Sequence, residues 1–170
     1  MMELFDAIQS RSSAARLAEP GPTQEQLQRL IAAAARAPDH GRLRPWRFAI
    51  VNGTKREEFA TAVAEARRAR LPDMTPDQIV AEKDKVRRSP TILVVGCAVR
   101  RDMLVKVPEI EQVIAVGAAV ENMFLAAQAM GLGVMWKTGP AAYDAGVKAV
   151  AGLAPDDHIV AILHLGTRAK

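Results

Sequence analysis

The sequence predicts an α+β fold, and three features carry this prediction. Residues 91–99 (TILVVGCAV) form a continuous apolar run, which is typical of a central strand buried on both faces. A longer apolar segment, residues 109–130, has the length and composition of a buried helix. Helical segments outnumber the expected strands and separate them irregularly, which favours an α+β fold over a regular doubly wound sheet.

The chain has the size and composition of one globular domain, residues 1–170. Its 170 residues are 49% hydrophobic and 25% charged, which excludes a disordered chain, a collagen-like repeat and a disulfide-stapled miniprotein. Cys97 is the single cysteine, so no disulfide can form within the chain and a reducing cytoplasm is expected. Residues 1–10 carry Glu3 and Asp6 and lack the pattern of a secretion signal.

The first third of the chain predicts two helices and a strand. Residues 4–8 suggest a short helix that ends near Ser10. Thr23 and Gln26 have the spacing of a capping box, and the apolar residues that follow predict a helix that stops near Pro38. Residues 46–51 alternate in polarity and predict a strand closed by Asn52-Gly53.

Residues 54–88 are charged, rich in alanine and helical in pattern, with a break near Leu71-Pro72. Nine basic residues are interleaved there with seven acidic ones. This mixture is typical of a solvated pair of helices with i,i+4 charge pairs, and we favour it over a nucleic-acid-binding surface.

The second half predicts the long helix and three shorter elements. The helix covers about residues 109–130, with Gly131 as the C-terminal cap. Because it is apolar around nearly its whole circumference, we expect burial on all sides. Its small residues 117–119 also suit close packing against a second subunit. A strand at 134–137, a helix at 142–151 and a strand at 158–165 follow, with His158 and His164 expected at a sheet edge or an interface.

The basic balance of the chain suggests either a nucleic-acid partner or a small anionic ligand. Lys and Arg number 23 against 19 Asp and Glu, a net charge of +4. Aromatic residues make up only 4% of the chain, which argues against a protein that stacks exposed rings on bases. A glutamate near the centre of the long helix argues against a membrane span.

The usual catalytic signatures are absent from the sequence. Gly131-Leu132-Gly133 does not continue as a dinucleotide-binding fingerprint, and there is no P-loop, GxSxG or HExxH motif. We therefore expect no metal site and no dedicated catalytic triad.

Three polar segments instead suggest a flat, phosphorylated ligand. The first, Arg11-Ser12-Ser13 with Arg16, could hold a phosphate. The second is the loop between a predicted helix and strand, with Arg36, His40, Arg42, Arg44 and Trp46. The third places an aromatic ring, a cation and a hydroxyl at a strand end, in Trp136, Lys137 and Thr138.

These segments resemble the nitroreductase family of flavoenzymes, and in particular its small bacterial NAD(P)H nitroreductases. The resemblance runs over nearly the whole chain and is most specific in Arg16-Leu-Ala-Glu-Pro20 and Ala37-Pro-Asp-His40. It implies an α+β fold with a central mixed sheet surrounded by helices. It also implies an obligate homodimer that holds FMN non-covalently at its interface.

The same resemblance implies roles for individual positions. FMN phosphate and ribityl oxygens would be held by Arg11, Ser12 and Ser13. Arg36 and His40 would lie beside the flavin, from the same or the partner subunit. Three further residues would complete the site: Trp136, Lys137 and Thr138. The segment matched to nicotinamide dinucleotide contact comprises Ala126, Ala127, Gln128, Ala129, Met130 and Gly131.

Two departures from the family pattern stand out. The second of two adjacent arginines is Ser12 here, so phosphate binding is expected to depend on Arg11 and Arg16. The glutamine that commonly precedes Pro-Trp is Arg44 here, which adds a charge that could alter flavin potential or contact an anionic substrate. Lys137, and secondly Arg36, are candidates for tuning the flavin.

The expected function is therefore FMN-dependent oxidation of NADH or NADPH, with a nitroaromatic, quinone or similar acceptor reduced in a ping-pong reaction. Because a flavin supplies the redox chemistry, the absence of a triad is expected. Two alternatives remain open at this point. One is another flavin reaction on the same fold, such as dehalogenation, dehydrogenation or flavin degradation. The other is a non-enzymatic flavin-binding or basic nucleic-acid-associated protein.

Overall fold

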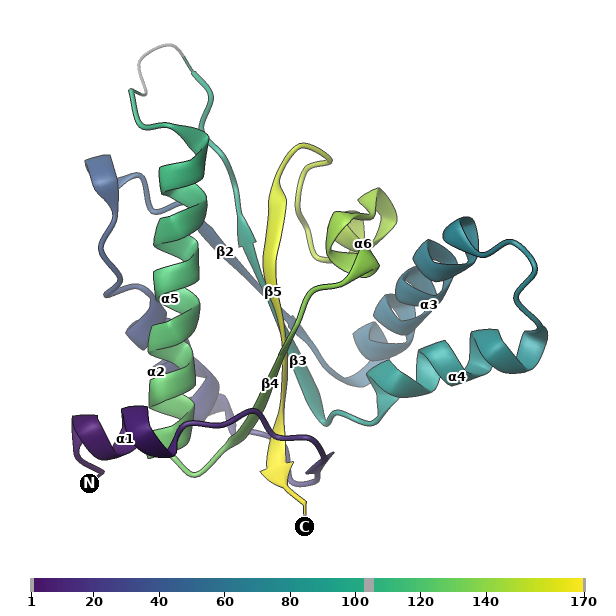
Figure 1. Cartoon of the computed structure of the whole chain (residues 1–170), viewed down its shortest axis with the longest axis horizontal. Coiled ribbons are helices and arrows are strands. Elements are labelled where there is room, and N and C mark those ends of the chain that lie inside the picture. Colours follow the sequence, from purple (N-terminus) through teal and green to yellow (C-terminus); the bar gives the residue numbers. More distant parts are fainter. Residues whose placement is uncertain (1, 103–105, 170) are drawn as a thin grey trace.

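The centre of the fold is strand β3 (Thr91–Cys97), in which every residue is buried. The computed structural model describes residues 2–102 and 106–169. Strand β3 lies between β2 (Trp46–Val51) and β5 (His158–Arg168), as Figure 1 shows. Its apolar run can be continuous because helices cover both faces of the sheet. The predicted strand buried on both faces is confirmed.

The strand order is β1-β5-β3-β2, with β4 (Gly133–Lys137) also paired to β5. Every pairing among the described strands is antiparallel, so the expectation of a mixed sheet is wrong, whereas the α+β class is confirmed. Strand β1 (Leu17–Ala18) was not predicted, because a strand of two residues has too few positions for an alternating pattern.

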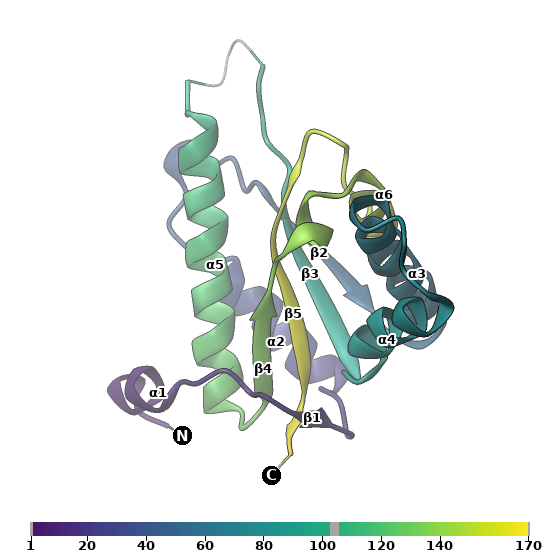
Figure 2. The same cartoon turned by 45° about the vertical axis from the view of Figure 1, so that its right-hand side comes forward.

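Alternate residues of β3 point to two separate cores. Leu93, Val95 and Cys97 pack under α2 (Gln24–Ala34) and α5 (Glu109–Ala129). Ile92 and Val94 belong to the opposite core. That core lies under α3 (Gly53–Arg70), α4 (Pro76–Arg87) and α6 (Ala145–Val150), and Figures 1 and 2 show the two helical layers. The short α1 (Leu4–Ser10) lies beside the C-terminal end of α5.

Helix α5 follows its predicted bounds closely: it ends at Ala129, and Gly131, whose φ is +72°, follows the capping residue Met130. The expectation that it is buried all round is wrong. Ile110 and Ile114 are 63% and 62% exposed, because they project away from the sheet. Length and composition alone would allow α5 to span a membrane, but its other faces pack in the core. An exposed apolar stripe therefore remains on this helix.

Most other elements lie near their expected positions, but one predicted helix and the surroundings of one histidine differ. The predicted helix at 142–151 is divided into η2 (Pro140–Tyr143) and α6, because Asp144 accepts a hydrogen bond from the Val147 amide and starts a new helix. The expectation for His164 is wrong: this residue is 4% exposed, because β5 lies between β3 and β4 rather than at an edge.

The predicted capping box of α2 is present and supports a stability prediction. The Thr23 hydroxyl accepts a hydrogen bond from the Gln26 amide at 3.2 Å, and the Gln26 side chain accepts one from the Thr23 amide at 2.9 Å. We expect Thr23→Ala to lower the free energy of unfolding by about 1 kcal/mol. Urea denaturation checks this, with Thr23→Ser as a control that keeps the cap. Equal stability of the two variants would contradict it.

Candidate functional site

The first predicted segment begins directly after α1, where Arg11 packs against α5. Its guanidinium carbon lies 5.6 Å from the centre of the Phe124 ring, a cation–π contact. Its Nε lies 4.0 Å from a carboxylate oxygen of Glu121. Both partners belong to α5, so this helix fixes the position of Arg11.

Arg168, which was not predicted as a site residue, lies next to Ser12. Its guanidinium donates to the Ser12 carbonyl at 2.6 Å, to the Ser12 hydroxyl at 3.1 Å and to Gln128 Oε1 at 3.2 Å. No carboxylate among the described residues forms an ion pair with it. The predicted last strand stopped at residue 165, but β5 continues to Arg168, opposite Leu17. The longer strand brings the Arg168 guanidinium to the predicted phosphate-binding residues, Arg11, Ser12 and Ser13.

Two adjoining cavities open beside this group, on the face of the sheet that α3 and α4 cover. One, of about 480 Å³, is lined by residues 14–17 and Ala169, which continue the chain from Ser13 and Arg168. The other, of about 320 Å³, is lined by parts of α3, α4 and η2 and by Thr138. Lys85, Lys137 and His164 line both cavities. Their sizes are those of small-molecule sites.

The linings of these cavities are rich in positive charge. Arg16, Arg67 and Arg88 join Lys85 and Lys137 around them. Burial lowers the pKa of Lys137, and the neighbouring charges of Lys85 and Arg88 lower it further. Glu82, a carboxylate in the same lining, is paired with Lys85 at 2.6 Å. The cavities therefore suit a ligand with several hydrogen-bond acceptors and negative charge.

A buried polar pair forms part of the same cavity wall. His164 Nδ1 lies 2.7 Å from the Ser89 hydroxyl, and each residue is only 4% exposed. Burial, and secondly the charge of Lys137, lowers the pKa of His164 to about 3. The imidazole is therefore neutral at physiological pH.

Trp136 and Lys137 occupy opposite faces of β4, because successive strand side chains alternate. The Trp136 indole donates to the Val160 carbonyl at 3.2 Å and lies 6.2 Å from the Phe124 ring. Lys137 and Thr138 line the 320 Å³ cavity instead. Trp136 and Arg11 therefore both contact the Phe124 ring, whereas Lys137 and Thr138 line the cavity on the other face of the sheet.

The second predicted segment lies elsewhere on the subunit. His40 Nδ1 lies 2.5 Å from a carboxylate oxygen of Glu111, near the N-terminal end of α5. Arg36 lines a separate cavity of about 390 Å³ together with Asp39, Arg42, Arg44 and Trp46. Glu111 and Glu121, which contact His40 and Arg11, are ten residues apart on α5, or about 15 Å along the helix axis. One subunit alone does not bring these two segments together.

The segment from Ala126 to Gly131 divides between core and site. Ala127 is completely buried, whereas Gln128 donates to the Ser10 hydroxyl at 3.1 Å and accepts from Arg168. Gln128 therefore belongs to the group around Arg168 and Ser12.

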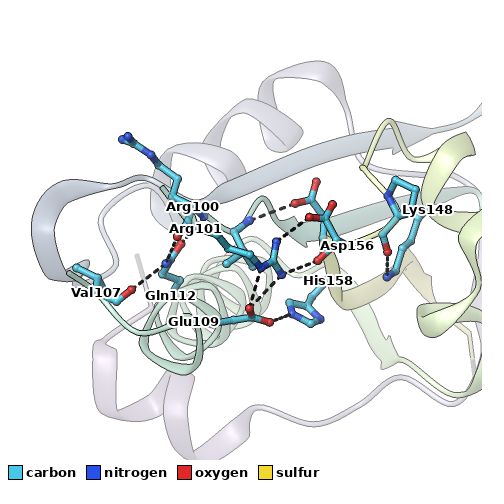
Figure 3. A network of polar contacts seen from close by, with 11 residues as sticks. Arg100, Arg101, Val107, Glu109, Gln112, Lys148, Asp156 and His158 are labelled. Atoms are coloured by element: carbon cyan, nitrogen blue, oxygen red, sulfur yellow. Dashed lines mark hydrogen bonds and ion pairs between the residues drawn. The ribbon is translucent and has the colours of Figure 1, made fainter. Parts of the chain in front are cut away.

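A polar network anchors the N-terminal end of α5, as Figure 3 shows. Arg101 bridges Glu109 and Asp156, each at 3.0 Å, and Glu109 also contacts His158 at 2.5 Å. These contacts, His158 first and then Arg101, lower the pKa of Glu109. The buried Gln112 side chain bonds both the amide and the carbonyl of Arg100 at 2.9 Å. This network is structural, since it fixes the helix that positions both polar segments.

Comparison with known proteins identifies relatives along the whole chain. A family model described as "Nitroreductase family" matches residues 8–167. YdjA of Escherichia coli, named "Putative NAD(P)H nitroreductase", is 36% identical over 168 residues, which cover 98% of this chain and 88% of that protein. A Haemophilus influenzae protein with the same name is 30% identical over 171 residues, which cover 98% of this chain and 89% of that protein.

Solved structures share the fold. A nitroreductase-like family protein from Bacillus cereus has a TM-score of 0.83 and 24% identity, covering 100% of this chain and 88% of that chain. A nitroreductase with bound FMN from Bacteroides fragilis has a TM-score of 0.73 and 21% identity, covering 99% of this chain and 90% of that chain.

Proposed function

This chain belongs to the nitroreductase family, and from that premise we propose that it is an FMN-dependent oxidoreductase. It would oxidise NADH or NADPH and pass the electrons to a nitroaromatic, a quinone or a similar acceptor. The observation that carries the proposal is the pair of cation-lined cavities beside the Arg168–Ser12 group. The names of the relatives, which include NAD(P)H and FMN, support it.

The donor chemistry of the group around Arg168 fits the FMN phosphate. Guanidinium groups and hydroxyls are good phosphate donors, and they are provided by Arg168, Arg11, Ser12 and Ser13. The Arg168 guanidinium is held in place by its bonds to Ser12 and Gln128, which reduces the ordering cost of binding. We propose that these residues hold the phosphate and the ribityl oxygens.

The cavities would then hold the ring system. FMN, when bound, supplies the ability to accept a hydride and to pass electrons on. Lys137 places a positive charge at the junction of the two cavities and would stabilise negative charge on the ring. Of the segment 126–131 at the C-terminal end of α5, the residues other than the buried Ala127 are proposed to contact the nicotinamide dinucleotide. The buried Cys97 suits a reducing cytoplasm, where we place the single-domain protein.

We also propose that two copies of the chain complete each site. Ile110, Ile114 and the small residues Gly117 and Ala118 leave an apolar stripe on α5. Packing two such stripes antiparallel about a twofold axis would place the N-terminal half of one α5 beside the C-terminal half of the other. Arg36 and His40 of one subunit would then approach the Arg11 segment of its partner. Within one chain, the α5 residues that His40 and Arg11 contact, Glu111 and Glu121, lie about 15 Å apart along the helix axis.

The dimer can be tested on its exposed stripe. We expect Ile114→Glu to convert the dimer to a monomer, because the interface would bury an unpaired carboxylate in each subunit. Light scattering coupled to size-exclusion chromatography measures the mass. Val80→Glu is a matched control, since Val80 is also exposed but lies on α4. A monomeric wild-type protein, or a dimeric Ile114→Glu variant, would contradict the proposed interface.

Absorption spectroscopy and steady-state kinetics test the proposed activity. The purified protein should carry FMN or take it up, and it should oxidise NADH or NADPH with a nitroaromatic or quinone acceptor. Double-reciprocal plots of initial rate against NAD(P)H concentration, recorded at several acceptor concentrations, should give parallel lines if the reaction is ping-pong. A protein that binds no FMN would refute the proposal. A flavoprotein without NAD(P)H oxidation would instead favour another flavin reaction, and salt-sensitive DNA or RNA binding would favour the non-enzymatic alternative.

A further inference from the structure

We infer that the Ser89–His164 pair fixes the flavin ring in its cavity: His164 Nε2 accepts a hydrogen bond from the imide N–H of the ring, while His164 Nδ1–H donates to Ser89. This inference rests on the proposed function, since it assigns a role toward FMN. It concerns a buried pair that neither the sequence patterns nor the family resemblance singled out.

The position of His164 supports the inference first. The residue lies in the middle of the sheet, opposite Met135 of β4 and Ile92 of β3. It lines both cavities, at the place where they also share Lys85 and Lys137. A ligand that extends through the two cavities must therefore pass over this imidazole.

The second ring nitrogen of His164 is available to such a ligand. Nδ1 is engaged by Ser89 at 2.7 Å, and no hydrogen bond from Nε2 is found among the described residues. Within the same residues, no buried side-chain nitrogen or oxygen is left without a partner. Nε2 therefore is not sealed in the protein interior and opens onto the cavity. A polar residue buried to this extent normally satisfies both of its polar atoms.

The lining chemistry determines which partner Nε2 would take. Lysine and arginine side chains can only donate hydrogen bonds, and five of them line the cavities. The flavin pyrimidine ring offers several acceptors to these donors but has one donor, its imide N–H. Glu82 is half-buried, is paired with Lys85 and lines only one of the cavities, whereas the neutral His164 is a buried side-chain acceptor that lines both.

Protonation and tautomer both agree with an acceptor role. The neutral imidazole has one N–H, so Nε2 can accept only if Nδ1 carries the proton. The Ser89 hydroxyl can accept that proton's hydrogen bond. Ser89 is itself held firmly, because Arg56 donates to the carbonyls of Ser89 and Pro90 at 3.1 and 3.3 Å. Ser89 thus acts as a positioning residue that selects the tautomer.

Binding of FMN and of 3-methyl-FMN, in which a methyl group replaces the imide hydrogen, tests the inference without turnover. We expect the wild-type protein to bind FMN about 10-fold more tightly than the methylated analogue, by fluorescence titration. In His164→Leu this discrimination should fall below about 2-fold. In His164→Gln, whose amide oxygen can replace Nε2 as acceptor, it should largely return. Circular dichroism and thermal unfolding confirm that each variant is folded.

The tautomer provides a second measurement, made on the FMN-free protein. Nitrogen-15 NMR should show the proton of His164 on Nδ1 in the wild type and a mixture of tautomers in Ser89→Ala, with Ser89→Thr restoring Nδ1–H. A proton on Nε2 in the wild type overturns the inference. Undiminished discrimination in His164→Leu, or equal affinity of the wild type for the two flavins, overturns it while leaving FMN binding intact. Failure to bind either flavin refutes the proposed function itself.

Discussion

Replacing Arg168 by alanine is expected to weaken FMN binding about 100-fold, because the variant loses charge-assisted hydrogen bonds to the phosphate worth roughly 3 kcal/mol together. The guanidinium is prepared for this contact. It is held by the Ser12 carbonyl and hydroxyl and by Gln128, and no described carboxylate neutralises it. Fluorescence titration with FMN measures the change.

Riboflavin separates the phosphate contact from a general loss of the site. Because riboflavin lacks the phosphate, its affinity should change less than about 3-fold in Arg168→Ala. Arg70→Ala, at the exposed C-terminal end of α3, removes an equal charge elsewhere and should leave both affinities unchanged. If Arg168→Ala weakened FMN and riboflavin binding equally, Arg168 would support the site without contacting the phosphate.

Elements with a strong local pattern were predictable from the sequence. The continuous apolar run predicts the buried strand β3, and the capping box predicts where α2 begins. Both signals lie within a few consecutive residues, so they can be recognised without knowing the fold. Strand β1 and the last residues of β5 could not be predicted in this way. They form because Leu17 pairs with Arg168, a contact between residues 151 positions apart.

The same distinction explains what could be predicted of the site. The polar segments around Arg11, Arg36 and Lys137 are visible locally, because cations and hydroxyls collect in short loops and strand ends. Arg168 and the Ser89–His164 pair are not visible, since each acquires its role only when β5 lies beside β1, β3 and β4. An isolated histidine in an apolar strand gives no indication of what its neighbours will be.

The basic balance of the chain also has a structural interpretation. On α3 and α4 half of the cations pair with carboxylates; for example, Arg87 lies 2.7 Å from Glu57 and 2.9 Å from Asp84, and Arg68 lies 2.9 Å from Glu65. Arg168 and Lys137 form no such pair among the described residues. Because paired surface charges present little net field, cations without such a pair contribute most of the positive field that acts on a ligand in these cavities.

The buried imidazole of His164 should make the protein sensitive to mild acid. Its pKa in the folded state is lowered from 6.5 to about 3, by burial first and then by the charge of Lys137. The unfolded chain therefore binds a proton below about pH 6.5 that the folded protein does not take up. Stability contributed by the neutral ring is present above that pH, and it falls by about 1.4 kcal/mol per pH unit as the solution is acidified.

Urea denaturation at pH 6.5 and pH 4.5, with saturating FMN, isolates this contribution. These pH values lie above the pH range in which carboxylates with lowered pKa values, such as Glu57 and Glu109, become protonated in the folded protein. Between these two pH values the wild type should lose roughly 2 kcal/mol more stability than His164→Gln, which cannot be protonated. Both proteins keep the charged groups that line the cavities with His164, and these therefore cancel in the comparison. They are Lys137, Lys85, Arg88, Arg16, Arg67 and Glu82. Equal losses in the two proteins would mean that His164 accepts a proton in the folded state, and that its burial does not hold the imidazole neutral.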